Sequence, residues 1–422
     1  MFNNAKVDDD GDGDDSLINR FSCIGSDQIY SISWCQSNSD LIAIGTSNSL
    51  QVISIDKDYS AKVIKTFRLG TRVNQISWGP TTSKNDPLVD QPRTVTSFEI
   101  LVACSDQNLR LLGYQRSLEE EEEDDDDDDL NRSRAGTTSI KVFGQGHSGH
   151  SGRITSIAWC NVPGYSNIIA SAGSDRCVLI WNIDGPDEDQ STTDDSVKVL
   201  NRSSPAPTLI GPLTFTPVSL SFHPNSSGRL MIYDSTGTIK LIDWTKPSRP
   251  IILSLFEPRT MIEKLHGTRQ MDQDRIGSAD WKSDEVDVFG GLSGNRWAVW
   301  DLGSTKAGNP IATGDAWGPG VVADRFRWCP TNPRLFALSS SSPNASSAGF
   351  GAIQIYYTAF PQSPRTIHLP VEINPGRKRV HDIDWQPAKR GGETGPANVT
   401  GGRGDVLCVA VGRELVWIRL GI

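Results

Sequence analysis

The stretch GHSGRITSIAWCNVPGYSNIIASAGSDRCVLIWNI, residues 149–183, decides the fold of this chain. It contains three short apolar segments, of which the first ends at Trp159, the second closes on Ser174 and Asp175, and the third ends at Trp181. Polar, Gly-containing turns separate them, which predicts three consecutive antiparallel β-strands. A sheet this small buries too little apolar surface to be stable alone. The stretch therefore predicts sister units elsewhere in the chain.

Segments of the same form as RITSIAW recur along the chain, and we call the seven segments the marker strands. They end at Trp34, Trp78, Trp159, Phe222, Trp281, Trp328 and Trp385. A second and a third apolar strand follow each marker strand, and outer fourth strands are expected at 140–143, 251–255 and 366–369. Seven repeats of a four-stranded unit are typical of the WD40 propellers. We therefore predict an all-β fold, a seven-bladed WD40 β-propeller.

The repeats are longer than the minimum for this architecture. Trp34 and Trp385 are 351 residues apart, so one repeat averages about 58 residues against roughly 40 to 45 in a minimal repeat. The excess falls in segments rich in Pro, Gly, Ser or charge, which we expect to be loops: 81–97, 115–139, 185–212, 342–350 and 389–404. Long loops are tolerated because the entropy of loop closure grows slowly with length.

The two ends of the chain predict how the propeller closes. The sequence stops at ELVWIRLGI (414–422), which supplies a third strand for the last blade and leaves no residues for a fourth. The β-compatible segment LINRFSCI (17–24) precedes the first marker strand, and we expect it to supply the missing outer strand of the last blade. Such closure removes an exposed sheet edge. Residues 17–422 are thus expected to form the propeller, and residues 1–16 a disordered acidic tail.

The charge of the chain is concentrated in two segments. The formal net charge is −10, but residues 119–129 are eleven consecutive carboxylates and the first fifteen residues carry six aspartates. Without these seventeen charges the remaining chain carries +7, so the propeller itself is mildly basic. The segment 115–139 is too polar to bury a core and is predicted to be a disordered loop. Contact of this loop with a basic partner is the alternative interpretation.

Several classes of protein are not supported by the sequence. No apolar run is long enough to span a membrane, and the N-terminus lacks the pattern of a secretory signal. The seven cysteines show no C-x-x-C spacing and are expected to be reduced core residues of a cytosolic or nuclear protein. No zinc, Walker or dinucleotide motif is present, so no metal or cofactor is expected. Direct nucleic-acid binding is not expected either.

One set of residues allows two interpretations. His150, Ser171, Asp175 and Trp181 match the hydrogen-bonded tetrad of WD40 blades, and the first three also have the residue types of a hydrolase triad. A tetrad of this kind lies between strands and satisfies buried polar groups. We favour the structural interpretation, and we expect no catalytic residues.

Arginine occurs six residues before the marker aromatic in four blades, at Arg72, Arg153, Arg275 and Arg379. In a WD40 blade this position opens the innermost strand at the rim of the central channel, on the top face. Four arginines there would form a positive crown that contributes to a partner's docking surface. Local pairing of each arginine with a loop carboxylate or a strand-end carbonyl is equally compatible with the sequence.

Beyond the WD40 pattern, the order of the local signatures resembles that of the nucleoporin thirty-seven family. The resemblance rests on KTFRLGTRVNQISWGP (65–80), GHSGRITSIAW (149–159), LMIYDSTGTIKLIDW (230–244), GGLSGNRWAVWDL (290–302), FRWCPTNPRLFAL (326–338) and VLCVAVGRELVWI (406–418). These segments follow one another in collinear order from about residue 24 to residue 420.

This resemblance implies a non-enzymatic scaffold subunit of the Y-shaped outer-ring complex of the nuclear pore. It implies docking on a large α-solenoid nucleoporin, contact with other subunits of that complex, localisation at the nuclear envelope, and a role in pore assembly and the transport of mRNA and protein. The alternative is a WD40 adaptor of another complex, either a ubiquitin-ligase substrate receptor or a chromatin reader. The third strands lack the W-D-x-R signature common in the former, since Gly303 and Asp184 stand at the Arg position.

Overall fold

The structure is a computed structural model in which the elements are strands, with one short helix among the described residues. The residues described are 17–22, 27–56, 60–80, 96–116, 137–145, 148–184, 197–200, 206–265, 277–285, 287–304, 308–317, 322–341, 352–369, 380–388 and 405–420. The acidic tail (1–16), the run 119–129 and Arg275 and Arg379 lie outside these residues. Within the described part, no helix is long and apolar enough to cross a membrane.

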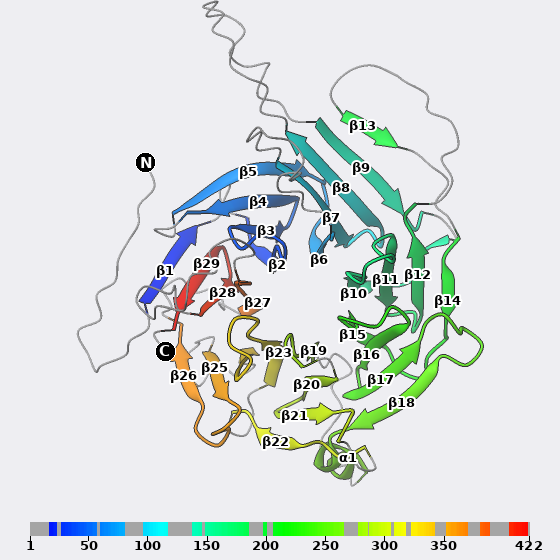
Figure 1. Cartoon of the computed structure of the whole chain (residues 1–422). Helices are drawn as coiled ribbons and strands as arrows, with labels where there is room; N and C mark the ends of the chain where they lie inside the picture. Colours follow the sequence, from blue (N-terminus) through cyan, green and yellow to red (C-terminus); the bar gives the residue numbers. More distant parts are fainter. Residues whose placement is uncertain are drawn as a thin grey trace, which may run out of the picture.

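The strands form seven sheets arranged in a ring (Figure 1), and their pairing is antiparallel except for one outer strand of blade 2. Blade 1 contains β2 (Ile29–Trp34), β3 (Leu41–Thr46), β4 (Ser49–Ile55) and β5 (Ala61–Arg68). Blade 2 contains β6 (Val73–Trp78), β7 (Thr96–Cys104), β8 (Leu109–Arg116) and β9 (Thr137–Phe143). Blade 3 contains β10 (Ile154–Trp159), β11 (Ile168–Gly173), β12 (Val178–Asn182) and β14 (Thr208–Ile210).

Blades 4 to 7 continue the ring in the same order. Blade 4 contains β15 (Pro217–Phe222), β16 (Arg229–Asp234), β17 (Thr238–Asp243) and β18 (Ile251–Phe256), and blade 5 contains β19 (Ala279–Trp281), β20 (Val288–Ser293), β21 (Arg296–Asp301) and β22 (Ala312–Asp315). Blade 6 contains β23 (Val322–Trp328), β24 (Leu335–Ser341), β25 (Ala352–Tyr357) and β26 (Arg365–His368). Blade 7 contains β27 (Val380–Trp385), β28 (Val406–Val411), β29 (Glu414–Arg419) and β1 (Leu17–Ser22). The seven-bladed propeller predicted from the sequence is confirmed.

The predicted order of strands within each blade is also confirmed. Each marker strand is the innermost strand of its sheet, and these seven strands surround the central axis in Figure 1. We call the face of the ring on which Arg72 and Arg153 precede their innermost strands the top face. The expected outer strands of blades 2, 4 and 6 are present as β9, β18 and β26.

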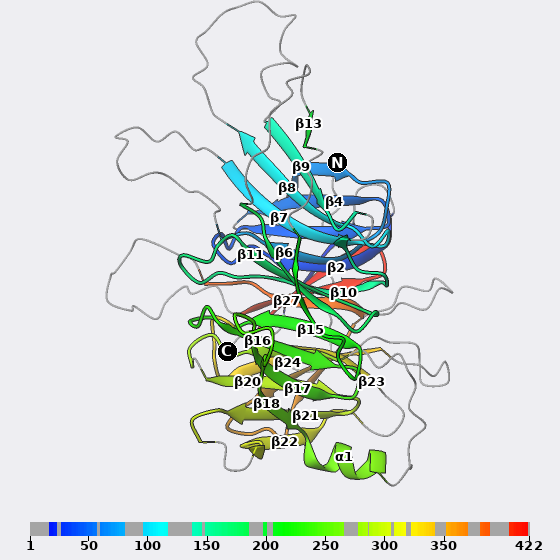
Figure 2. The same cartoon turned by 90° about the vertical axis from the view of Figure 1, so that its right-hand side faces the viewer.

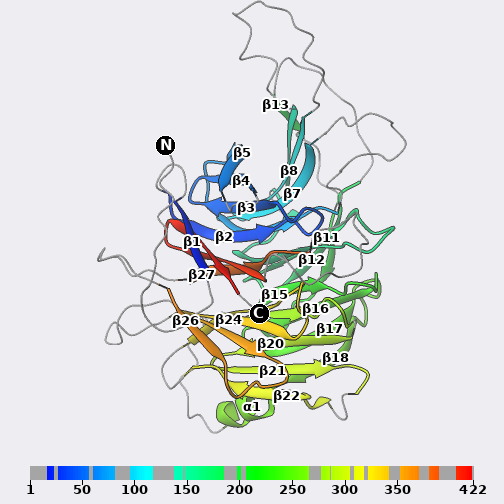
Figure 3. The same ribbon diagram turned by 60° about the vertical axis from the view of Figure 1, so that its left-hand side comes forward.

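The N-terminal strand closes the last blade as predicted. β1 pairs antiparallel with β29 over six residues, from Leu17 opposite Arg419 to Ser22 opposite Glu414. Figure 3 shows β1 beside the strands of blade 7. The first and last strands of the chain therefore share one sheet, which joins the two ends of the ring.

The segment 185–212 was expected to be a loop, and this expectation is wrong in part. Residues 208–210 form β14, the outer strand of blade 3. Residues Val197–Leu200 form β13, which pairs in parallel with β9 as a fifth strand of blade 2 (Figure 2). The pairing partners are far apart in sequence, so the local pattern could not reveal them.

The hydrophobic core lies between the blades rather than within any one of them. The buried apolar side chains form clusters, each of which joins two neighbouring blades. Between blades 7 and 1, for example, Trp34 and Ile42 pack with Cys408 and Trp417. Each blade therefore depends on its neighbours for stability, which is the physical reason that one repeat predicted six others.

Candidate functional site

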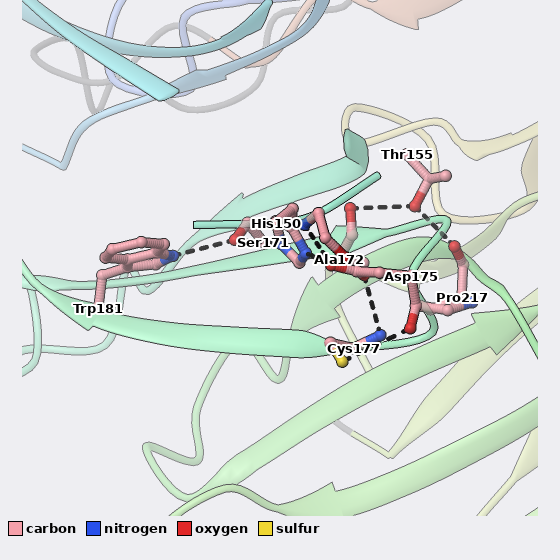
Figure 4. A network of polar contacts seen from close by, with 9 residues as sticks. His150, Thr155, Ser171, Ala172, Asp175, Cys177, Trp181 and Pro217 are labelled. Atoms are coloured by element: carbon pink, nitrogen blue, oxygen red, sulfur yellow. Dashed lines mark hydrogen bonds and ion pairs between the residues drawn. The ribbon is translucent and has the colours of Figure 1, made fainter. Parts of the chain in front are cut away.

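The tetrad residues of blade 3 form one continuous chain of hydrogen bonds (Figure 4). The Trp181 indole donates to Ser171 Oγ at 2.9 Å, and Ser171 Oγ lies 2.9 Å from His150 Nε2. His150 Nδ1 lies 3.0 Å from Asp175 Oδ2. Since the carboxylate only accepts, Nδ1 carries the proton and Nε2 accepts from the serine hydroxyl. The four groups thus satisfy one another.

The tetrad connects the segment before β10 to the turn between β11 and β12 by hydrogen bonds. Asp175 also accepts from the backbone N–H groups of Ser151 and Cys177, at 3.0 and 3.2 Å. Gly173 leaves room for this arrangement, because a Cβ at this position would lie 2.5 Å from His150 Nδ1 and 2.6 Å from Asp175 Oδ1. The tetrad therefore depends on a fifth residue, Gly173, that the motif did not indicate.

The order Ser171–His150–Asp175 reproduces the contacts of a catalytic triad, but the serine is closed to any substrate. Ser171 has no exposed surface, and its oxygen already accepts from the Trp181 indole. A triad nucleophile needs an accessible oxygen and donors facing the developing oxyanion. The geometry therefore supports the structural interpretation of these residues.

Arg72 and Arg153 occupy equivalent positions on the top face. The carbonyl of Arg72 accepts from Ser105 N at 2.9 Å, and the carbonyl of Arg153 accepts from Ser174 N at 2.8 Å. Arg153 is exposed, and Arg72 is half-buried. The other two members of the predicted crown, Arg275 and Arg379, lie outside the described residues.

Local contacts hold the Arg72 side chain in a defined position. Its Nε donates to Asn74 Oδ1 at 2.9 Å and to Ser105 Oγ at 3.1 Å. Its guanidinium carbon lies 4.9 Å from the centre of the Tyr30 ring, an arrangement that attracts a cation to the aromatic face. Among the described residues, these three partners of Arg72 are polar or aromatic side chains without formal charge. They do not neutralise the positive charge of the guanidinium.

The same rim continues into blade 7. His381 packs edge-on against Tyr30, with ring centres 5.5 Å apart, and its Nε2 lies 2.7 Å from Gln28 Nε2. Because the Gln28 amide nitrogen can only donate, His381 Nε2 accepts in this contact. Blades 7, 1 and 2 therefore present a connected polar and aromatic surface at the channel rim.

Sequence reasoning missed a group of charged side chains near the channel, carried by the marker strands of blades 5, 6 and 7. Arg327 of β23 interacts electrostatically with Asp280, Asp382 and Asp384. Arg325 pairs with Asp382, with 3.0 Å between Nε and Oδ1. These three carboxylates and two guanidinium groups form what we call the axial ion cluster.

The carboxylates of this cluster are also structural acceptors between blades. Asp384 Oδ2 accepts from Trp34 N of blade 1 at 2.8 Å, and Asp280 Oδ2 accepts from Trp328 N of blade 6 at 3.1 Å. In both cases an aspartate one residue before a marker Trp binds the backbone of the next marker Trp. The repeated D-W pair at 280–281 and 384–385 was the available sequence signal.

Burial changes the protonation of this cluster. It raises the pKa of Asp384 to about 7, although the Arg327 charge acts in the opposite direction. It raises the pKa of Asp280 as well, again against the effect of Arg327. Both side chains keep some exposed surface beside the channel, but the surrounding protein replaces most of the water that would stabilise a charge. If one of the three carboxylates binds a proton, the two remaining negative charges equal the two positive charges of the arginines.

The described residues contain no group of three or more His, Cys, Asp and Glu side chains placed to hold a metal ion. Hydrogen bonds join neighbouring blades at the Asp280 and Asp384 carboxylates of the axial ion cluster.

Comparison with known proteins identifies relatives of the chain. No protein-family model matches it. It is 26% identical to Nucleoporin Nup37 of Mus musculus over 281 residues, and these aligned residues cover 66% of this chain and 64% of the mouse protein. It is 24% identical to Nucleoporin Nup37 of Homo sapiens over 324 residues, and these aligned residues cover 76% of each chain. The chain thus spans slightly less than two thirds of the mouse relative.

Proposed function

We propose that this chain, a homologue of the Nup37 nucleoporins, is a non-enzymatic scaffold subunit of the outer ring of the nuclear pore complex. The resemblance stated from the sequence alone is confirmed by the two relatives. Their name implies localisation at the nuclear pore complex, in the nucleus and nuclear envelope. The proposal goes further, to docking on an α-solenoid nucleoporin, contact with other subunits of the Y-shaped complex, and support of pore assembly and nucleocytoplasmic transport.

The observation that carries this proposal is the combination of homology and fold. A match over two thirds to three quarters of the chain falls on a propeller whose seven blades share their core with their neighbours. Such a rigid ring offers two faces and an outer wall to partners, and function then depends on surface residues rather than on a cleft. The buried Ser171 of the triad-like group agrees with a scaffold role.

We also propose that the arginine crown on the top face contributes to partner binding. Arg72 supports this because it is held in place by Asn74, Ser105 and Tyr30. A positioned guanidinium loses little further conformational freedom when it binds a carboxylate. Charge reversal of Arg72 and Arg153 together is expected to reduce partner recovery about tenfold or more, which corresponds to about 1.4 kcal/mol. Unchanged recovery would remove the crown from the docking surface.

Affinity purification tests the proposed function. The chain is tagged at its own locus, and the proteins recovered with it are identified by mass spectrometry. Recovery of helical outer-ring nucleoporins in amounts similar to the bait supports the proposal. Recovery of a cullin adaptor or of histones without nucleoporins would favour the alternative roles considered from the sequence.

A further inference from the structure

The outer strand of blade 4 differs from the outer strands of blades 1, 5 and 6. The exposed positions of β5, β22 and β26 carry polar side chains: Lys62, Thr66, Arg68, Thr313, Asp315, Thr366 and His368. In β18 the exposed positions are Ile251, Ile252, Ser254 and Phe256. Edge strands are usually protected by charges or by a covering element, because their free backbone groups pair readily with other chains. β18 has no charged side chain at all.

The exposed apolar side chains of blade 4 continue onto neighbouring elements. The helix α1 (Pro258–Leu265) follows β18 directly and exposes 53% of Ile262. Ile311, which precedes β22 of blade 5, is 55% exposed. Gly308, three residues before Ile311, lies against β18, since a Cβ on Gly308 would lie 3.1 Å from Leu255 Cδ2. Figure 1 shows β18, α1 and β22 adjacent at the periphery of the ring.

We call the surface formed by Ile251, Ile252, Phe256, Ile262 and Ile311 the outer apolar wall. Exposed large hydrophobic residues outside it are few in the described part of the chain: Tyr165, Leu209, Phe215 and Phe360. Leu209 and Phe215 lie in and after the outer strand of the adjoining blade 3. Apolar surface gathered on one side of a protein is typical of a contact with another macromolecule.

We propose that the outer apolar wall binds an amphipathic α-helix of the partner, one that carries carboxylates beside its apolar face. This inference rests on the proposed function and specifies the surface of the propeller that is used. The wall is built from a strand, a helix and a connection of the next blade. A partner strand added to β18 would pair with its edge and leave Ile262 and Ile311 exposed. A helix presents side chains at positions i, i+3, i+4 and i+7 and can cover all three elements.

The charges around the wall favour an acidic partner over a second copy of this chain. Arg249 precedes β18 by two residues, Arg259 lies in the first turn of α1, and both are exposed. The one carboxylate between them, Glu257, is buried and accepts from the Thr260 backbone and hydroxyl groups at 2.6 and 2.7 Å. Two copies joined at β18 would bring these arginines into one interface, where Glu257 is buried and bonded to Thr260.

Targeted substitutions on the wall test the inference in the full-length chain. Two variants, Ile252→Asp with Phe256→Asp, and Ile262→Asp alone, are compared with the wild type after tagging at the native locus. The matched control is Phe360→Asp, which places the same charge at a 69% exposed aromatic residue of blade 6. We expect both wall variants to recover helical nucleoporins at least about tenfold less well, since loss of a central contact costs about 1.4 kcal/mol or more. The control should stay within about twofold.

Thermal unfolding of the purified variants separates lost binding from lost folding. Because Ile262 is already exposed, Ile262→Asp should unfold at the wild-type temperature, and it decides the test if the double variant is unstable. Hydrogen exchange of the purified complex should slow in residues 251–262 and in a helical segment of the partner.

Three results would overturn the inference. They are normal recovery by a folded Ile262→Asp variant, exchange protection elsewhere on the propeller, and a wild-type dimer in sedimentation that Ile262→Asp dissociates. If the wild-type chain recovers no nucleoporin at all, the proposed function itself fails. The two failures are therefore distinguishable.

Discussion

Blade 3 and the other six blades fill the same interior position by different chemistry. The strand register places Ser171 of blade 3 opposite Leu179, and the equivalent residues elsewhere are Ile44, Val102, Ile232, Gly291, Leu338 and Val409. At this position blade 3 thus has a serine of the hydrogen-bonded tetrad, whereas the other six blades have an apolar side chain or glycine. Blade 6 instead stacks Phe336 on Phe326 and Tyr356, with ring centres 4.9 Å apart in both pairs.

This difference shows that the tetrad is one of several ways to stabilise a blade. The marker strand is the part that recurs, and it contacts the next blade directly. The indole N–H groups of Trp78, Trp281 and Trp385 donate to the carbonyls of Ser33, Ser221 and Arg327, in each case the residue before the preceding marker aromatic. Each of these three contacts joins two neighbouring blades near the axis. The Trp159 indole instead donates to Ser166 O within blade 3, and the Trp34 and Trp328 indoles find no hydrogen-bond partner among the described residues.

The largest effect is expected from removal of the strand that closes blade 7, a blade without a tetrad. Deletion of residues 1–22 removes β1 and leaves the edge of β29 unpaired over six residues. We expect a fall in melting temperature of more than about 10 °C, or failure to fold. Deletion of residues 1–16 keeps β1 and is the control, and its melting temperature should match the wild type. Equal stability of the two deletions would contradict the closure of the ring by β1.

The axial ion cluster is the polar network of blades 5 to 7, and Arg327→Ala should break it. The substitution leaves Asp280 and Asp384 without the positive charge between them, so the free energy of unfolding should fall by about 3 to 5 kcal/mol. Denaturant unfolding at neutral pH measures this change. Arg413→Ala, at an exposed turn of blade 7, is the control and should change stability by less than about 0.5 kcal/mol. An effect of that small size for Arg327→Ala would exclude a role for the cluster in stability.

A matched pair of tryptophans isolates the hydrogen bond of the tetrad. Trp300 of blade 5 has the register position of Trp181, but Gly291 stands where blade 3 has Ser171. The Trp300 indole N–H is buried and finds no hydrogen-bond partner in the described chain. Trp181→Phe should therefore destabilise the protein by about 1 to 2 kcal/mol more than Trp300→Phe. Equal losses would show that the tetrad contributes packing alone.

The last prediction is a pH dependence of stability that arises from Asp384. The unfolded chain releases this proton near pH 4, as an ordinary aspartate does, whereas the folded protein holds it up to about pH 7. The folded state thus binds more protons between these values, and stability falls as the pH rises through this window. The slope should be steeper than that of Asp384→Asn by roughly 1 kcal/mol per pH unit. Identical slopes from pH 5 to 7 would contradict the raised pKa.

The sequence predicted the blades well because their inner three strands carry dense, periodic apolar residues around each marker aromatic. The outer strands β5, β14 and β22 were not predicted, since they are short or largely polar and are defined by their pairing partners. β13 pairs with a strand of another blade, which no local pattern encodes. The tetrad could be read from residue types, whereas the axial ion cluster and the outer apolar wall depend on which strands the ring places together.

Imaging of the chain in its native cells is the most direct test of the proposal that it is a scaffold subunit of the nuclear pore. A fluorescent tag at the native locus, viewed together with a pore marker, measures where the protein resides. We predict a punctate signal at the nuclear rim that coincides with the pores and persists through interphase. A diffuse signal in the nucleus or cytoplasm, without enrichment at the rim, would contradict it.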